Sequence, residues 1–245
     1  MRQKVVVVSA GLGVPSTTRM LADQMGAKVL ARLSARGIGA VLDVIDLREY
    51  AVDIANNMVT GYAGPALATV IERVGAADAM IAVTPTFSAS YSGLFKSFFD
   101  VLDPKFIDSM PVLFGATGGS PRHSLVLEMA IRPLFSYLRA NTMATAVYAS
   151  PEDWGGSGTN PLEHRIGKGA GELAAVLAAR LTSSKSSQGT TTDGTNAGTS
   201  TSGDSGQVEQ DLVDASSHKD RRAQQIMATM STLPFEELLA QTQRR

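Results

Sequence analysis

The sequence contains no cysteine among its 245 residues. Disulfide bonds, thiolate metal sites, iron–sulfur clusters and dithiol chemistry are therefore excluded, and any redox activity needs an organic cofactor. A large excess of charge is also missing, because 22 basic and 23 acidic residues leave a formal net charge of −1. This balance lacks the basic field that favours nucleic acid or an acidic membrane. We expect no metal site and no nucleic-acid or membrane partner.

Long apolar segments are missing as well. No apolar run approaches the roughly 20 residues that a membrane-spanning helix requires. The first residues resemble a secretion signal, with Arg2 and Lys4 before a short apolar run. A Ser/Thr-rich turn and an amphipathic helix follow directly, which is untypical of such signals. The expected location is the cytoplasm.

Buried strands alternate with helices along the first 182 residues. Residues 5–8 are four consecutive valines, a pattern typical of a strand buried on both faces. In the segment 16–36, apolar residues recur every four positions and share one helical face. The same alternation predicts further strands at 41–47, 79–84, 112–116 and 143–149. It predicts further helices at 65–74, 93–102, 124–139 with an interruption at Pro133, and from the capping residue Asn160 to 181.

Five strand–helix units predict an α/β fold with a doubly wound parallel sheet of strand order 2-1-3-4-5. In such a sheet the ligand crevice lies beyond the carboxyl ends of the strands. Function is therefore expected in the loops that follow residues 8, 84 and 116.

The remainder of the chain differs in composition. In residues 183–206, 18 of 24 residues are Ser, Thr or Gly, too few apolar groups to offset the entropy of ordering. We predict a domain at 1–182, a disordered, flexible low-complexity linker at 183–216 and a C-terminal helical tail at 217–245. Helices are expected at 220–231 and 234–241. Their small apolar faces either dock on the same domain or its dimer partner, or recognise a separate protein.

The first loop reads SAGLGVPSTTR over residues 9–19. Ser16 replaces the third glycine of a dinucleotide fingerprint, and the lysine of a nucleoside-triphosphate loop is missing. A cluster of hydroxyls remains at the expected helix N-terminus, formed by Ser9, Ser16, Thr17 and Thr18. Hydroxyls and free helix N–H groups together suit a terminal monophosphate. Alternatively, Ser16 or Thr17 only caps the helix.

The second and third loops contain small residues and aromatic rings. In the second, residues 84–96, Phe87 and Tyr91 either flank a planar ligand ring or belong to the core. In the third, residues 115–124, Gly118 and Gly119 allow positive φ, which would turn their amides into the crevice. His123 is either a ligand contact or a surface residue.

Arg122 beside it is either a phosphate clamp or a solvated charge.

The segment TPTFSASYSGLFKSFFD at 84–100 resembles the loop TP-x-Y-x-x-S-Y-x-G-x-LK of the NAD(P)H-dependent FMN reductases. The resemblance is to the flavodoxin-like superfamily, especially the branch associated with luciferase-like monooxygenases, and covers about residues 4–182. It implies a flavodoxin-like fold and hydride transfer from NADPH or NADH to FMN, with no catalytic side chain required. It also implies a homodimer or higher homo-oligomer, and a monooxygenase partner that receives reduced FMN.

The resemblance also assigns FMN-binding positions in all three loops. These are Ser9, Ser16, Thr17 and Thr18 at the phosphate, Pro85, Thr86, Phe87 and Ser88 along the ring, and Thr117, Gly118, Gly119 and His123 at its pyrimidine edge. Two positions depart from the family pattern. The first loop lacks the arginine of the usual G-S-x-R opening, which implies weaker phosphate binding, and Phe87 replaces a common tyrosine.

Other functions stay open at this stage. A flavodoxin-like electron carrier, or a quinone or dye reductase that retains FMN, has the same fold, as does a non-catalytic flavin-binding scaffold. Electron carriers of this type are usually strongly acidic, unlike this chain. A hydrolase is disfavoured because no G-x-S-x-G segment occurs.

Overall fold

The computed structural model describes residues 2–154 and 161–186. The expected cap Asn160 and the expected C-terminal helices lie outside the described residues, as does the expected linker from residue 187 onward. Seven strands are described: β1 (Gln3–Ser9), β2 (Ala40–Asp46), β3 (Ala79–Phe87), β4 (Ser90–Tyr91), β5 (Pro111–Thr117), β6 (Asn141–Thr142) and β7 (Val147–Ala149). The α-helices are α1 (Thr17–Ser34), α2 (Ala51–Thr60), α3 (Pro65–Gly75), α4 (Gly93–Val101), α5 (Arg132–Tyr137) and α6 (Pro161–Ser186).

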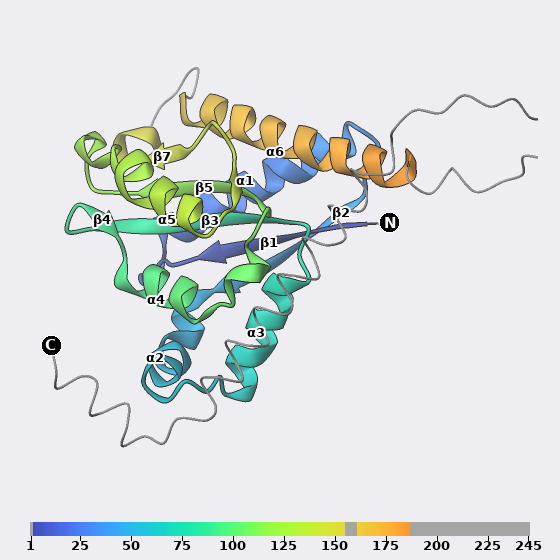
Figure 1. The fold of residues 1–245 in the computed structure, drawn as a ribbon. Coiled ribbons are helices and arrows are strands. Elements are labelled where there is room, and N and C mark those ends of the chain that lie inside the picture. Colours follow the sequence, from blue (N-terminus) through green and yellow to red (C-terminus); the bar gives the residue numbers. More distant parts are fainter. Residues whose placement is uncertain (1, 155–160, 187–245) are drawn as a thin grey trace, which may run out of the picture. The chain divides into compact units, whose positions relative to one another are not determined.

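The sheet has the predicted doubly wound, flavodoxin-like order. Parallel pairing runs from β2 through β1 and β3 to β5, whose other edge pairs with β6 and β7. Helices cover both faces, with α1 and α6 on one side and α3 and α4 on the other (Figure 1). The valines of β1 alternate between the two cores, so Val5 and Val7 pack beneath α1 and α6 while Val6 and Val8 face α3 and α4. The two-sided burial predicted for this strand is confirmed.

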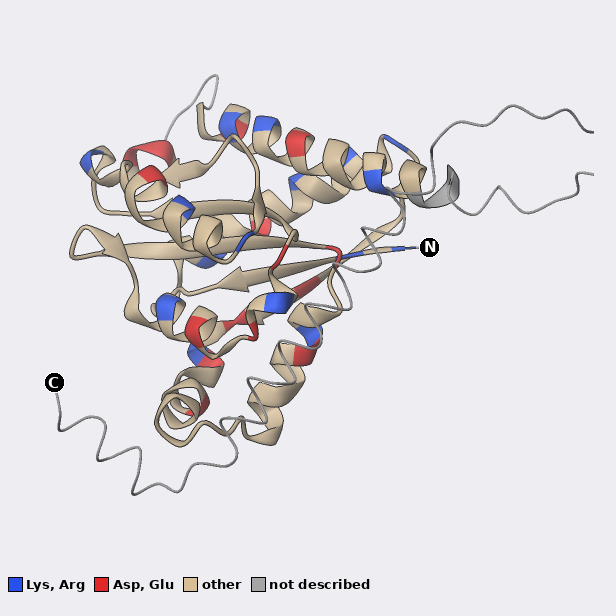
Figure 2. Ribbon diagram, in the orientation of Figure 1, with Lys and Arg blue, Asp and Glu red and all other residues tan. Residues whose placement is uncertain are grey.

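Charged residues lie outside these cores. Figure 2 shows Lys, Arg, Asp and Glu distributed over the described helices, whereas β3 and β5 carry none. Among residues 2–154 and 161–186, no helix has the length and apolar character needed to cross a membrane.

The fifth position in the sheet differs from the prediction of one strand at 143–149. Two short strands occupy it, because three polar backbone groups between them pair with side chains, although the N–H of Met143 still donates to the Val112 carbonyl of β5 at 2.9 Å. Arg132 donates to the carbonyls of Met143 and Ala144 at 3.0 and 3.1 Å. Glu172 accepts from the backbone N–H of Thr145 at 2.8 Å. These contacts use the polar groups that a continuous strand would present to its neighbour.

The helix predicted at 124–139 is also divided. One π-helical turn (Leu127–Ile131) precedes α5, and Pro133 lies in the first turn of α5. Proline has no N–H to donate to the preceding turn, so the regular hydrogen-bond ladder cannot continue through it. The expected interruption at Pro133 is confirmed. Three of the α-helices and strands lie outside every predicted range, namely α2, β6 and the short antiparallel strand β4, which pairs with the end of β3.

An ion pair fastens the edge strand β2 to α3. The Nε of Arg73 lies 3.0 Å from Oδ2 of Asp43, Nη2 also donates to the same carboxylate, and Nη2 bonds the Val44 carbonyl at 3.0 Å. The hydrogen bonds from Arg73 hold the pKa of Asp43 below its ordinary value near 3.8. A lowered folded-state pKa contributes stability above the ordinary value and loses it as pH falls through the lowered value.

We therefore expect Asp43→Asn to cost about 1 kcal/mol of unfolding free energy at neutral pH. As the pH falls through the lowered pKa of Asp43, the difference from the wild type should shrink, because the wild-type carboxylate becomes protonated. Urea unfolding of both proteins at neutral pH and at acidic pH gives the difference in unfolding free energy under each condition. An equal difference at both values would show that the ion pair does not contribute to acid sensitivity.

Candidate functional site

A cleft of about 560 Å³ lies at the carboxyl ends of β1, β3, β5 and β7. This volume is within the range of roughly 300–1,000 Å³ that is typical of small-molecule sites. Nine of the twelve residues predicted from the sequence line it: Ser16, Thr17, Thr18, Pro85, Thr86, Phe87, Thr117, Gly118 and Gly119. The three separate loops therefore meet in one cavity, as predicted.

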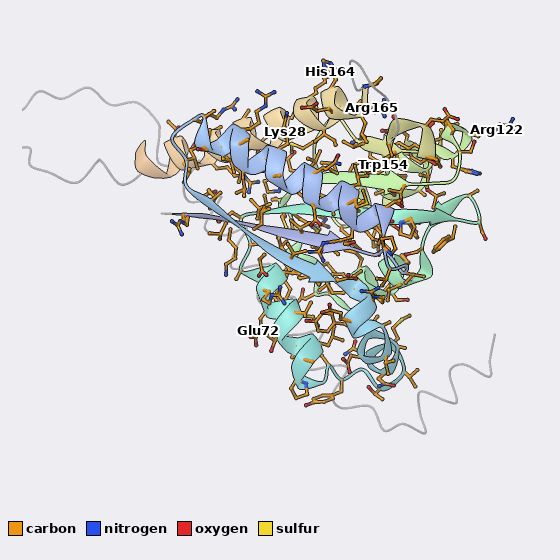
Figure 3. The ribbon with its side chains drawn as sticks, turned by 180° about the vertical axis from the view of Figure 1, so that it is seen from behind. Lys28, Glu72, Arg122, Trp154, His164 and Arg165 are labelled. Atoms are coloured by element: carbon orange, nitrogen blue, oxygen red, sulfur yellow. The ribbon has the colours of Figure 1, made fainter. Side chains whose placement is uncertain are left out.

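Three predicted residues do not line this cleft. Ser9 is fully buried at the end of β1 and is not among the residues that line the cavity, although its hydroxyl, like that of Thr86, has no hydrogen-bond partner among the described residues. Ser88 is exposed at the tip of the β3–β4 hairpin, beyond the residues that face the cleft. His123 is exposed in a 3-10 turn (Pro121–His123), as the surface alternative expected. Arg122 in the same turn lies at the outer edge of the molecule, away from Trp154 (Figure 3).

The first loop ends at the N-terminus of α1, which forms a polar part of the cleft. Ser16 is the N-cap, and its Oγ accepts a hydrogen bond from the Arg19 N–H at 3.2 Å. The capping alternative is therefore correct, yet the same residue also lines the cleft. The N–H groups of Thr17 and Thr18 have no acceptor among the described residues. With no acidic residue in the first turn, this end of α1 favours an anion.

Two arginines to which the sequence analysis gave no role lie at the first loop, Arg19 at its end and Arg48 beside it. Arg48, which follows β2, donates from Nη1 to the Gly13 carbonyl at 3.3 Å. Arg19 donates to Asp23 at 2.8 Å. Both guanidinium groups also lie within 4 Å of Asp46, at 3.6 Å from Arg48 and 3.8 Å from Arg19. Their charges are thus paired with carboxylates, and Arg48 fixes the loop from outside the cleft.

The first and third loops are joined by a buried contact between two hydroxyls. Thr18 Oγ1 and Thr117 Oγ1 are 2.7 Å apart. Both side chains are almost fully buried, so this hydrogen bond sets the spacing between the start of α1 and the end of β5.

The second loop forms a hairpin whose two aromatic residues have different roles. Phe87 is 47% exposed and lines the cleft. Tyr91 packs against the core, with its ring centroid 6.0 Å from that of Phe95. The position of Phe87 fits the alternative in which the ring flanks a ligand. The position of Tyr91 fits the alternative in which the ring belongs to the core. Ser88 and Ala89 turn the hairpin with positive φ values of 49° and 63°.

The glycines of the third loop differ from the prediction in their backbone conformation and in the reason that glycine is needed. Neither Gly118 nor Gly119 has positive φ, and the N–H of Gly118 donates to the Ala149 carbonyl at 3.1 Å. Its amide is therefore engaged within the protein. Glycine is required at position 118 by close packing, because a Cβ there would lie 2.0 Å from the hydroxyl oxygen of Tyr148. That hydroxyl donates to the Ser120 carbonyl at 2.8 Å, and burial raises the Tyr148 pKa.

The end of β7 and the turn that follows it supply a further wall that the sequence analysis missed. Ala149, Pro151 and Trp154 line the cleft, and so do Leu12, Gly13, Pro15 and Met20 around the first loop. A signal for Trp154 was present: the carboxyl end of the fifth strand lies at the same sheet edge, and the only tryptophan of the chain follows it.

The residues of the cleft fit a mononucleotide such as FMN. The Thr86 Oγ1 is buried at the cleft and lies beside the Tyr148 phenol, but forms no hydrogen bond of acceptable geometry with a described residue. A buried hydroxyl without a partner is costly unless a ligand or water completes it. Free helix N–H groups suit a phosphate, and the mainly apolar remainder suits a planar ring.

Comparison with known proteins agrees with this geometry. The model of the NADPH-dependent FMN reductase family matches residues 3–155. The FMN reductase (NADPH) of Pseudomonas aeruginosa is 36% identical over 182 residues, which are 73% of this chain and 91% of that protein. The NADH-dependent FMN reductase SfnF of Pseudomonas putida is 36% identical over 151 residues, covering 61% of this chain and 78% of the relative.

Solved structures show the same fold. An oxidoreductase from Corynebacterium diphtheriae superposes with a TM-score of 0.70 and 42% identity, covering 73% of this chain and 98% of that one. The apo form of an NADH:FMN oxidoreductase (EMOB) superposes with a TM-score of 0.63 and 23% identity, over 71% of this chain and 89% of that one. The chain belongs to the NADPH-dependent FMN reductase family.

Proposed function

We propose that this protein is an NAD(P)H-dependent FMN reductase that binds FMN in the cleft at the carboxyl ends of the strands. The observation that carries the proposal is the union of three loops in one cavity, where the N-terminus of α1 meets the β3–β4 hairpin. The N-terminus of α1 provides donors for a phosphate, and the hairpin provides an apolar wall for a ring.

The proposed binding roles follow from the described positions. The N–H groups of Thr17 and Thr18 and the hydroxyl of Thr17, with Ser16, hold the phosphate, whereas the Thr18 hydroxyl is engaged by Thr117. The stretch from Pro85 to Phe87 lies along the ring, with the unpartnered Thr86 hydroxyl as a hydrogen-bonding group. Thr117, Gly118 and Gly119 form the wall at the polar ring edge. Ser9, Ser88 and His123 are not part of the proposed contact set.

The cleft walls have no ionisable side chain among the residues that the structure describes. Bound FMN supplies the chemistry by accepting hydride from the reduced nicotinamide, so the protein needs to bind and align both molecules. Without a cationic side chain on the walls, the phosphate is held by neutral donors, which form weaker bonds than charged ones. This supports FMN as an exchangeable substrate that leaves in reduced form for a partner such as a monooxygenase.

The test is anaerobic NADPH and NADH oxidation by the purified protein, with FMN varied from none to saturating. We expect saturable turnover that depends on added FMN, from protein that is nearly colourless when purified. Yellow protein whose flavin is not reduced by either nucleotide would overturn the proposal in favour of an electron carrier or a flavin-binding scaffold.

A homodimer in the cytoplasm is proposed as the working form. Exposed apolar side chains at and beside the rim of the cleft, Leu12, Val14 and Phe87, support self-association at this edge.

A further inference from the structure

The segment after β7, which the family resemblance did not point to, is a turn closed by hydrogen bonds. Asp153 Oδ2 accepts hydrogen bonds from the backbone N–H of Ser150 at 2.8 Å and from its hydroxyl at 2.9 Å. The N–H of Asp153 in turn donates to the Ser150 carbonyl at 3.0 Å. Three hydrogen bonds thus hold the 3-10 turn Pro151–Trp154 against the end of the strand.

An arginine from α6 fastens this turn to the body of the domain. The Nη2 of Arg165 donates to Asp153 Oδ1 at 2.7 Å and to the Tyr148 carbonyl at 3.1 Å. Both carboxylate oxygens of Asp153 are therefore engaged. Burial alone would raise the pKa of Asp153, but the bonds from Ser150 and Arg165 outweigh it and lower the pKa. Figure 3 shows Arg165 on α6, with Trp154 on the neighbouring turn.

The fixed turn places Trp154 between the core and the cleft. Trp154 is partly buried and packs against the hydrophobic core beneath α1 and α6. It also lines the cleft, where Phe87 is the other aromatic residue among the described walls. An aromatic face gives a planar molecule binding energy from buried area and from ring stacking.

We propose that Trp154 contacts the bound flavin nucleotide and that Asp153 and Arg165 are its positioning pair. The proposal rests on the proposed function, since it assigns the binder of FMN in that same cleft. The indole offers a rigid aromatic face, and the ion pair prevents the turn from moving this face away from the cavity. Loss of the pair therefore weakens binding without removing any group that touches the ligand.

The contact can be tested directly because the chain has one tryptophan. Protein labelled with 5-fluorotryptophan gives a single ¹⁹F resonance, and we expect FMN to shift it saturably, with the same Kd that flavin fluorescence reports. A resonance that stays unchanged while flavin fluorescence shows binding would overturn the contact.

Variants test the energetic contribution. We expect Trp154→Ala to raise the Kd for FMN about tenfold, and Trp154→Phe to raise it less because an aromatic face remains. Tyr62→Ala removes an exposed aromatic side chain that does not line the cleft, and should bind as the wild type does. An unchanged Kd in Trp154→Ala would overturn the proposal.

The positioning role predicts a split between binding and turnover. Asp153→Asn should raise the Kd for FMN severalfold and broaden or shift the ¹⁹F resonance of the free protein, with kcat at saturating FMN nearly unchanged. Unchanged Kd and resonance would overturn the role of the pair. If the wild-type protein itself does not bind FMN, the proposed function fails, an outcome distinct from binding that is insensitive to Trp154.

Discussion

Gly118→Ala is expected to weaken FMN binding by about tenfold or more, and Gly118→Val by a larger factor. A Cβ at this position would lie 2.0 Å from the Tyr148 hydroxyl oxygen and 3.1 Å from Cζ. Tyr148 is 7% exposed and its hydroxyl is bonded to the Ser120 carbonyl, so the ring has little freedom to withdraw. The loop from Thr117 to Ser120 must move instead, and this loop forms a wall of the cleft. Titration of flavin fluorescence measures the effect.

A second substitution separates this steric effect from other causes. Tyr148→Phe removes the oxygen that a Cβ at position 118 would strike, so the double variant with Gly118→Ala should recover most of the lost affinity. Gly64→Ala is a matched glycine control, because a Cβ there meets no atom within 4 Å. If Gly118→Ala retains wild-type affinity and turnover, the third loop does not belong to the binding site.

Gly115→Ala is expected to lower the unfolding free energy by about 1–3 kcal/mol. Gly115 lies within β5, where a Cβ would be 2.8 Å from the Val147 carbonyl oxygen and 3.2 Å from the Met25 sulfur. The first neighbour is backbone of the adjacent strand and the second belongs to α1. The Met25 side chain can adjust its rotamer, but the Val147 carbonyl cannot yield without shifting a strand that is packed in the sheet.

Urea unfolding gives the comparison, with Gly171→Ala in α6 as the control. A Cβ at position 171 meets nothing within 4 Å, so the helix should gain up to about 1 kcal/mol from the better helix former. Opposite signs for the two glycine substitutions are therefore expected. Equal unfolding midpoints for Gly115→Ala and the wild type would show that the strands can separate at no cost.

Most of the fold could be predicted because its strands and helices carry strong local patterns. The four valines of β1 and the four-residue apolar repeat of α1 define their elements without reference to the rest of the chain. The hairpin strand β4 was missed because its turn residues, Ser88 and Ala89, adopt positive φ without the glycine or asparagine that usually signals such a turn. Likewise, the strand predicted at 143–149 began too early and β6 was missed, because Arg132 and Glu172, which bond the backbone between β6 and β7, come from other elements.

The sequence by itself determined that loops rich in hydroxyls and glycines follow the strands of the sheet. Only the tertiary structure decided which residues of these loops face the cavity. Burial of Ser9, exposure of His123 and the packing of Gly118 on Tyr148 depend on residues distant in the chain. The pairing of Thr18 with Thr117 spans 99 positions. Local patterns specify elements because backbone preference and periodicity act over a few residues, whereas a binding site is made by contacts that exist only once the sheet has assembled.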